Sequence, residues 1–290
     1  MSGSVNGSDW GSRTLEQRLI GLKAIAPDPF VHVTLEGAAG VLGDTNNPLR
    51  LNLFSTSVRM LFEHIMGPLA PKEEVVNCSW YEPVPNTNGP VRAQRIQYWL
   101  QGGLSDEYVT EEFQLKPQEM RARLVKAFNN LSKHVHGRSD TLIVDIAAQE
   151  AEAKATLDAV EELLTTYHES RRALIVPLVD SLDESAVQSM LSETILDVDE
   201  LATHHTIDDI CPMSTTVDSI DHATVHYRVS GDIEVTLQWG SNSDRRKGDG
   251  AELGHSFPFV CTFDVPVDDP SNIADAEVSF GVDTSGWYGN

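Results

Sequence analysis

The one strongly basic stretch of this sequence ends near two histidines. Residues 116–138 carry six Lys and Arg side chains against a single acidic one, Glu119. His134 and His136 lie near the end of this stretch, and imidazoles titrate near neutral pH. Cations bind nucleic-acid phosphates, and an imidazole takes a proton from a 2′-hydroxyl or gives one to the leaving oxygen. We therefore predict a nucleic-acid site here, with His134 and His136 as an acid/base pair.

The cations that would contact phosphate lie on two expected helices. Arg92 and Arg95 are on adjacent turns of the earlier helix and extend the basic surface. For the later helix, the simpler alternative is a solvated helix end, where the helix dipole favours cations. For Arg92 and Arg95, the simpler alternative is an ion pair with Glu63 or Asp106. The predicted contacts are Arg92, Arg95, Arg121, Arg123, Lys126, Lys133 and Arg138.

A second arrangement with possible chemistry lies in the last third of the chain. Asp232 and Glu234 have i, i+2 spacing on an expected strand, so both side chains lie on one face. Paired carboxylates hold Mg²⁺, and Lys247 follows at a distance. The compact acidic–acidic–Lys order of many metal nucleases is absent. The alternative is an exposed polar face opposite an apolar one.

The polar segment Gly240–Gly250 is expected to be a loop. It contains the cationic cluster of the acidic half of the chain, in a flexible context rich in Gly and Ser. Such a loop suits a phosphate or the acidic edge of a partner, and the alternative is a plain hairpin connection. The residues predicted to bind there are Ser241, Ser243, Asp244, Arg245, Arg246 and Lys247.

Two regions with different periodicities must position these side chains. Apolar residues recur at helical spacing up to about residue 194, and alternation typical of strands follows. We expect an α+β protein with residues 1–12 disordered, a helical domain over 13–194 and a small antiparallel β-rich domain over 195–290. The expected helices are 14–25, 49–67, 91–101, one from 105, 118–134, 146–173 and 183–194, the last opened by an Asp183 cap. An extended piece is expected at 31–35, strands at 222–230, 233–239, 257–265 and 276–282, and a turn at Gly231–Asp232.

Charge is distributed unevenly between these regions. Residues 1–150 hold 14 Lys+Arg and 17 Asp+Glu, whereas residues 151–290 hold 7 and 27. Repulsion from phosphate disfavours nucleic-acid binding by the second half. Solubility is the simplest explanation of this acidity. The alternatives are an acidic surface that docks on a basic partner and one that mimics nucleic acid.

Cysteine content and hydropathy suggest the cellular compartment of the protein. The three cysteines are far apart and form no CxxC pair, which disfavours a zinc knuckle and a disulfide framework. No apolar run of 18 residues is present, so we expect no membrane span. The expectation is a cytoplasmic homo-oligomer.

Three stretches resemble the predicted pPIWI-associating nucleases, a bacterial family named from genome context. They are Ser57–His64; Arg92–Asp106 with Leu131–His136; and Leu237–Gly250 with Ser256–Phe259. The resemblance implies a prokaryotic conflict or phage-defence setting. The helical half also looks like the HEPN superfamily, whose RNases use an Arg-x4–6-His motif. Asn129 or Asn130 stands where that arginine is expected, so the resemblance adds Asn130 to the predicted catalytic residues.

Together these features predict a defence-system effector that binds or cleaves RNA or DNA. Mg²⁺ is the one cofactor considered, held by Asp232 and Glu234. The alternative is a non-enzymatic sensor or adaptor that binds a protein partner or a phage component.

Overall fold

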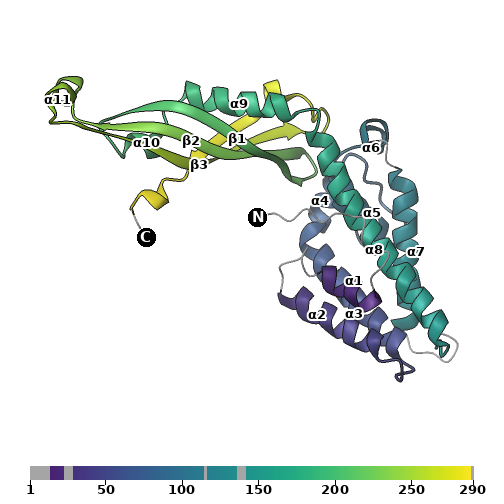
Figure 1. Ribbon diagram of the computed structural model, residues 1–290. Coiled ribbons are helices and arrows are strands. Elements are labelled where there is room, and N and C mark those ends of the chain that lie inside the picture. The colour runs from purple at the N-terminus through teal and green to yellow at the C-terminus, as the bar shows by residue number, and fades with distance from the viewer. Residues whose placement is uncertain (1–13, 23–28, 114–115, 136–141, 289–290) are drawn as a thin grey trace. The chain divides into compact units, whose positions relative to one another are not determined.

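The computed structural model describes residues 14–22, 29–113, 116–135 and 142–288. The chain forms two compact units (Figure 1). The helical unit comprises Met1–Gly102 and Asp106–Glu169, and the sheet unit comprises Gly103–Ser105 and Ser170–Asn290. Helices precede a four-stranded antiparallel sheet, which confirms the predicted α+β class. In the described part of the chain, no helix is both long and apolar enough to cross a membrane.

The helices of the helical unit match most of the expected segments. Thr14 caps α1, since the Thr14 hydroxyl accepts a hydrogen bond from the Gln17 amide and the Gln17 side chain accepts one from the Thr14 amide. The helices are α1 Leu15–Gly21, α2 Pro29–Gly43, α3 Arg50–Leu69, α4 Lys72–Asn77, α5 Arg92–Gln101, α6 Asp106–Phe113, α7 Pro117–Val135 and α8 Ile146–Ile175, which continues into the sheet unit.

Buried arginines tie these helices together. The Arg50 side chain is 2% exposed and donates to the Gln149 side chain at 2.6 Å and to the Leu42 carbonyl at 3.0 Å. These bonds join α3 to the end of α2 and the start of α8. Arg18 similarly joins α1 to α8, through Asp158 at 2.7 Å and Glu161 at 2.6 Å.

The sheet unit consists of one sheet in the order β1-β2-β3-β4, with every pair antiparallel. The helix α9, Val179–Ser192, lies along one face of this sheet, and Asp183 on α9 accepts a hydrogen bond from Thr215 on β1 (Figure 1). The strands are β1 His204–Ile220, β2 Thr224–Trp239, β3 Ala251–Pro266 and β4 Glu277–Val282; the short helices are α10 Leu196–Asp199, α11 Asn242–Lys247, η3 Ile273–Asp275 and η4 Ser285–Tyr288.

The two faces of the sheet differ in polarity. Odd-numbered residues of β2 and β3 form the buried face, including Tyr227, Ile233 and Phe263. Even-numbered residues form the opposite face, which we call the outer face. Because residues that pair across strands share a face, β1 residues such as Asp209 and Cys211 also belong to the outer face. The outer face therefore carries the polar side chains from which a site in this unit would be built.

Three local expectations are wrong. Residues 31–35 are helical, because Pro29 starts α2 and the apolar spacing continues through Ala38, Ala39 and Leu42. The helix α9 starts at Val179, and Asp183 binds Thr215 instead of capping it. Gly231–Asp232 is no turn but lies inside the continuous strand β2.

The strand β1 is not evident from the alternation of its residues. Its register shifts between Ile207 and Asp209, between Pro212 and Ser214, and between Val217 and Ser219. Each shift adds one unpaired residue, so the period of two is interrupted three times. Such bulges also protect a long edge strand against pairing with another chain.

Candidate nucleic-acid interface

A row of polar side chains lies on one face of α7. Arg123, Lys126, Asn130 and Lys133 are spaced by three, four and three residues, so they share that face, and we call them the α7 stripe. Lys126 and Lys133 are exposed, and the Arg123 side chain is 61% exposed. At 1.5 Å per residue the row is about 15 Å long, which matches roughly four phosphates of one strand.

The contacts within the α7 stripe are weak ones at the surface. Arg123 pairs with Glu162 on α8 at 2.8 Å, and both side chains are accessible to water. The Lys133 ammonium donates to the Asn130 side chain at 3.3 Å. Exposed pairs of this kind contribute little, so a phosphate is able to displace them.

The other predicted cations have structural partners. Arg121 pairs with Asp106 at 2.9 Å, and its side chain is 16% exposed. Arg95 donates to the carbonyls of Met66 and Ala70 and so caps the end of α3. Arg92 lies 3.4 Å from Glu63, as the simpler alternative expects. Arg138 lies outside the described residues.

The predicted acid/base pair is only partly described. The His134 side chain is 8% exposed and lies four residues after Asn130, one helical turn along α7. Its backbone carbonyl accepts a hydrogen bond of 2.6 Å from the Asn52 side chain on α3. His136 lies outside the described residues. Asn130, which the resemblance places in the catalytic set, is half-buried within the α7 stripe.

The predicted metal pair has an additional acidic neighbour. Asp232 and Glu234 lie on the outer face of β2, as predicted, and Asp209 of β1 stands directly opposite Glu234. Like charges directly opposite one another are unfavourable. The hydrogen bond of the Cys211 thiol to Asp209 raises the thiol pKa, and the charges of Glu234 and Asp232 act in the same direction. Three carboxylates and one thiol therefore face one another across β1 and β2.

Sequence reasoning misses Asp209 because it lies on the strand that the alternation does not predict. The bulge between Ile207 and Asp209 decides that Asp209 and not Asp208 stands opposite Glu234. Asp208 instead accepts a hydrogen bond of 2.6 Å from Thr236. No pattern in the sequence locates such a bulge.

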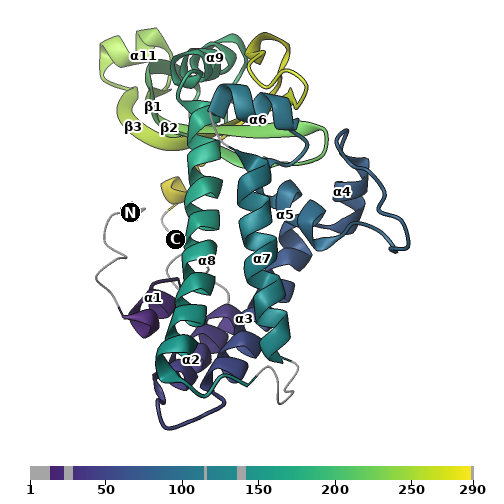
Figure 2. The ribbon, with the colours of Figure 1, turned by 90° about the vertical axis from the view of Figure 1, so that its right-hand side faces the viewer.

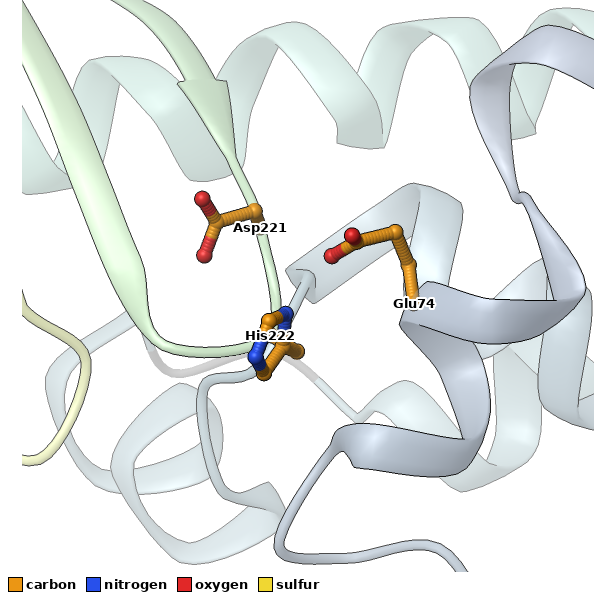
Figure 3. A group of neighbouring side chains, drawn as sticks. All are labelled: Glu74, Asp221 and His222. Carbon is orange, nitrogen blue, oxygen red and sulfur yellow. The ribbon is translucent and has the colours of Figure 1, made fainter.

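A second feature missed by the sequence is a histidine between two carboxylates. His226 contacts Asp264 through Nδ1 at 2.7 Å and Asp221 through Nε2 at 3.0 Å. Asp221 and His222 form the turn between β1 and β2 (Figure 3). Partial burial favours a lower His226 pKa, but the hydrogen bonds to the two carboxylates outweigh it and raise the pKa. Because both ring nitrogens are engaged, this histidine stabilises the hairpin and is unsuited to take up a substrate proton.

The predicted loop between β2 and β3 contains the short helix α11. The Ser241 side chain caps it through the Asp244 amide, and Gly248 ends it with φ of 84°. Hydrogen bonds from Ser241 lower the pKa of Asp244. Arg245 pairs with Glu252 at 2.6 Å, whereas Ser243, Arg246 and Lys247 are exposed. The segment is thus a capped short helix with exposed cations.

Two family models match the chain. One, described as a predicted pPIWI-associating nuclease, matches residues 22–160, and another with the same description matches residues 167–288. No curated protein and no solved structure matches. The first model spans α2 to the middle of α8, and the second spans the whole sheet.

Proposed function

Because the chain belongs to the predicted pPIWI-associating nucleases, we propose that it is a nuclease effector of a prokaryotic defence system that binds nucleic acid along the α7 stripe. The observation that carries the proposal is the exposure of Arg123, Lys126 and Lys133 on one helix face. Arg95 and Arg121 are held by structural partners, and Arg92 lies beside Glu63. The α7 stripe therefore concentrates the accessible positive charge of this region on one surface.

Phosphate binding along the α7 stripe requires no special geometry. Lysine ammonium groups act as mobile point charges, while a guanidinium contacts two phosphate oxygens at once. Asn130 adds a neutral donor between the cations. This combination binds a phosphate backbone without selecting a base sequence.

The cleavage step has two candidate locations. In a metal-free RNase related to the HEPN proteins, His134 and His136 would act beside Asn130, and the α7 stripe would position the strand. In a metal-dependent nuclease, Asp232 and Glu234 would hold Mg²⁺, and the cation would offset the repulsion between Glu234 and Asp209 opposite it. The metal would activate the attacking water.

A cleavage assay tests the nuclease proposal and distinguishes these locations. End-labelled single-stranded RNA and duplex DNA are incubated with the native protein in Mg²⁺ or in EDTA. We expect Lys126→Glu/Lys133→Glu to lower cleavage at least tenfold. Lys72→Glu, an exposed lysine on α4, is the control and should retain cleavage. Equal cleavage by both variants would refute the role of the α7 stripe.

The catalytic groups are tested in the same assay. Metal-free catalysis predicts cleavage in EDTA that His134→Ala/His136→Ala abolishes, with folding checked by thermal melting. Metal-dependent catalysis predicts that EDTA and Asp232→Asn/Glu234→Gln abolish cleavage. No cleavage of either substrate in either condition would contradict the enzyme proposal.

The exposed cations of the capped helix α11 support a second candidate, a non-enzymatic adaptor. The capped helix holds Arg246 and Lys247 at the end of the β2–β3 hairpin, where they would bind an acidic partner surface. Arg246→Glu/Lys247→Glu should then release a partner that co-purifies with the native chain. Retention of the partner by this variant would contradict the adaptor role of α11.

A further inference from the structure

The helical unit has a large apolar cavity. Its volume is about 300 Å³, and side chains from α1, α2, α3, α5, α7 and α8 line it. The helices α7 and α8 run side by side (Figure 2), and Phe128 on α7 and Leu157 and Val160 on α8 are among the lining residues. Nearly all of the lining is aliphatic or aromatic. We call this space the core cavity.

A space of this size and polarity is suited to an apolar occupant. Protein interiors are close-packed, and an unfilled apolar cavity lowers stability in proportion to its volume. Water does not compensate, because a buried water needs two or more polar partners. An engineered apolar cavity of about 150 Å³ stays dry and binds benzene. The core cavity has about twice that volume, which suits a longer hydrocarbon group.

A polar pocket of about 190 Å³ adjoins the core cavity. Phe62 and Met66 on α3 line both spaces, so the two spaces lie next to each other. The polar pocket also contains Arg92 and Arg95 from α5, and we call it the arginine pocket. On α5 these arginines and Trp99, which lines the core cavity, have spacings of three and four and share one helix face. Cations thus stand at one side of an apolar space.

The charges of the arginine pocket are held in place but only weakly neutralised. Arg95 is fixed by the carbonyls of Met66 and Ala70, which carry no net charge. Arg92 lies over the Phe62 ring at 6.0 Å, and its contact with Glu63 is 3.4 Å long. Glu63 is half exposed, and a surface pair of this kind is weak. An incoming anion is therefore able to replace Glu63 at Arg92.

From this arrangement we propose that the helical unit binds an anionic amphiphile. Its hydrocarbon tail lies in the core cavity, and its carboxylate or phosphate head group binds Arg92 and Arg95. A nucleobase fits the core cavity poorly, because its ring nitrogens and amino groups would find few hydrogen-bond partners there. The proposal adds a ligand to the proposed nuclease and does not depend on the α7 stripe.

Titration calorimetry of the full chain tests the head group. The probes are decanoate, decyl phosphate and decanol, which share a tail and differ in charge. We expect saturable one-to-one binding of both anions and at least tenfold weaker binding of decanol. Arg92→Gln should reduce that preference to threefold or less, and Glu63→Gln should strengthen binding of both anions. A preference for one anion identifies the class of head group. Equal binding of all three probes, or binding of none, would overturn the proposal.

Filling the core cavity tests the tail. Val160→Phe should abolish binding of decanoate and decyl phosphate while leaving the melting temperature unchanged or raised. Val144→Phe, at an exposed valine outside the cavity, is the control and should bind as the native chain does. Undiminished binding by Val160→Phe would overturn the proposal. Failure of both Val160→Phe and the smaller Val160→Leu to fold would overturn it too, because the space would then already be filled by the chain itself.

Discussion

At the scale of single residues, burial decides which arginines are available to a partner. Arg50 and Arg18 are 2% and 5% exposed, and their hydrogen bonds and ion pairs connect neighbouring helices. Arg95 donates a hydrogen bond to the Ala70 carbonyl at the end of α3, and Arg121 pairs with Asp106. A basic residue in the sequence therefore does not by itself predict a phosphate contact, because a partner within the fold can already occupy its side chain.

Loss of the Arg50 side chain should destabilise the helical unit strongly. Arg50→Met leaves the Leu42 carbonyl and the Gln149 side chain buried with unmet hydrogen bonds, so we expect the free energy of unfolding to fall by about 3 kcal/mol. Arg59→Met on the same helix is the matched control, with a loss below about 0.5 kcal/mol. Urea unfolding followed by circular dichroism measures both. Similar losses for the two variants would contradict the role of Arg50.

The His226 network should make the stability of the sheet unit depend on pH. The raised His226 pKa means that its stabilisation is complete below its ordinary value of 6.5 and is lost as pH rises through the folded-state pKa. Burial favours a higher Asp221 pKa, but the hydrogen bonds from His226 and from the Ala223 and Thr224 amides together outweigh it and lower the pKa. The contribution of Asp221 to stability is therefore complete above its ordinary pKa of 3.8 and is lost as pH falls through the folded-state pKa.

The stability difference between the native chain and His226→Gln should therefore be largest between pH 3.8 and 6.5, with the native chain the more stable. Thermal melts across this range and up to pH 9 measure the difference, which should shrink on the alkaline side. Thr262→Ala, at another outer-face position, is the control and should show no such trend. A difference that stays constant with pH would contradict the network.

At the scale of elements, close backbone approach fixes the path of β2. Gly231 was expected to permit a turn, but a Cβ at this position would lie 2.0 Å from the Cys211 carbonyl oxygen and 2.9 Å from the Phe259 ring. The glycine is needed because β1 and a ring on β3 leave no space for a side chain. The same residue thus supports a continuous strand instead of interrupting it.

Gly231→Ala should therefore destabilise the sheet unit by about 3 kcal/mol or prevent its folding, because backbone atoms would have to move. Gly254→Ala on β3 is the matched control, since a Cβ there meets nothing within 4 Å. We expect that variant to be neutral or slightly stabilising. Thermal unfolding with a tryptophan fluorescence signal measures both. Equal effects would contradict the proposed close approach.

The elements differ in how well their sequence predicts them. The segment of α7 is predictable because its apolar spacing and Pro117 define the helix, and its exposed face follows from the same spacing. The strand β1 is not predictable, because three bulges interrupt its alternation. The position of Asp209 opposite Glu234 is unpredictable for the same reason. The partners of Arg50 are not predictable either, since Gln149 is 99 positions away and only tertiary packing brings it near.

At the scale of the whole molecule, charge separates the two units. Residues 170–290 of the sheet unit hold 22 Asp+Glu against 6 Lys+Arg, whereas the helical unit holds 22 against 15. A polyanion is repelled by the acidic part, so accessible cations elsewhere decide where it binds. The α7 stripe supplies such cations on one exposed helix face. We predict that nucleic acid binds there.

The salt dependence of binding tests that claim most directly. Fluorescence anisotropy gives the affinity for labelled single-stranded RNA at several NaCl concentrations, for the native chain and for two double variants. Lys126→Gln/Lys133→Gln removes two proposed phosphate contacts and should flatten the plot of log affinity against log salt by about 1.4. Lys72→Gln/Lys154→Gln removes two exposed lysines of the same unit outside the α7 stripe and should leave the slope unchanged. Equal slopes for the two double variants would contradict the account.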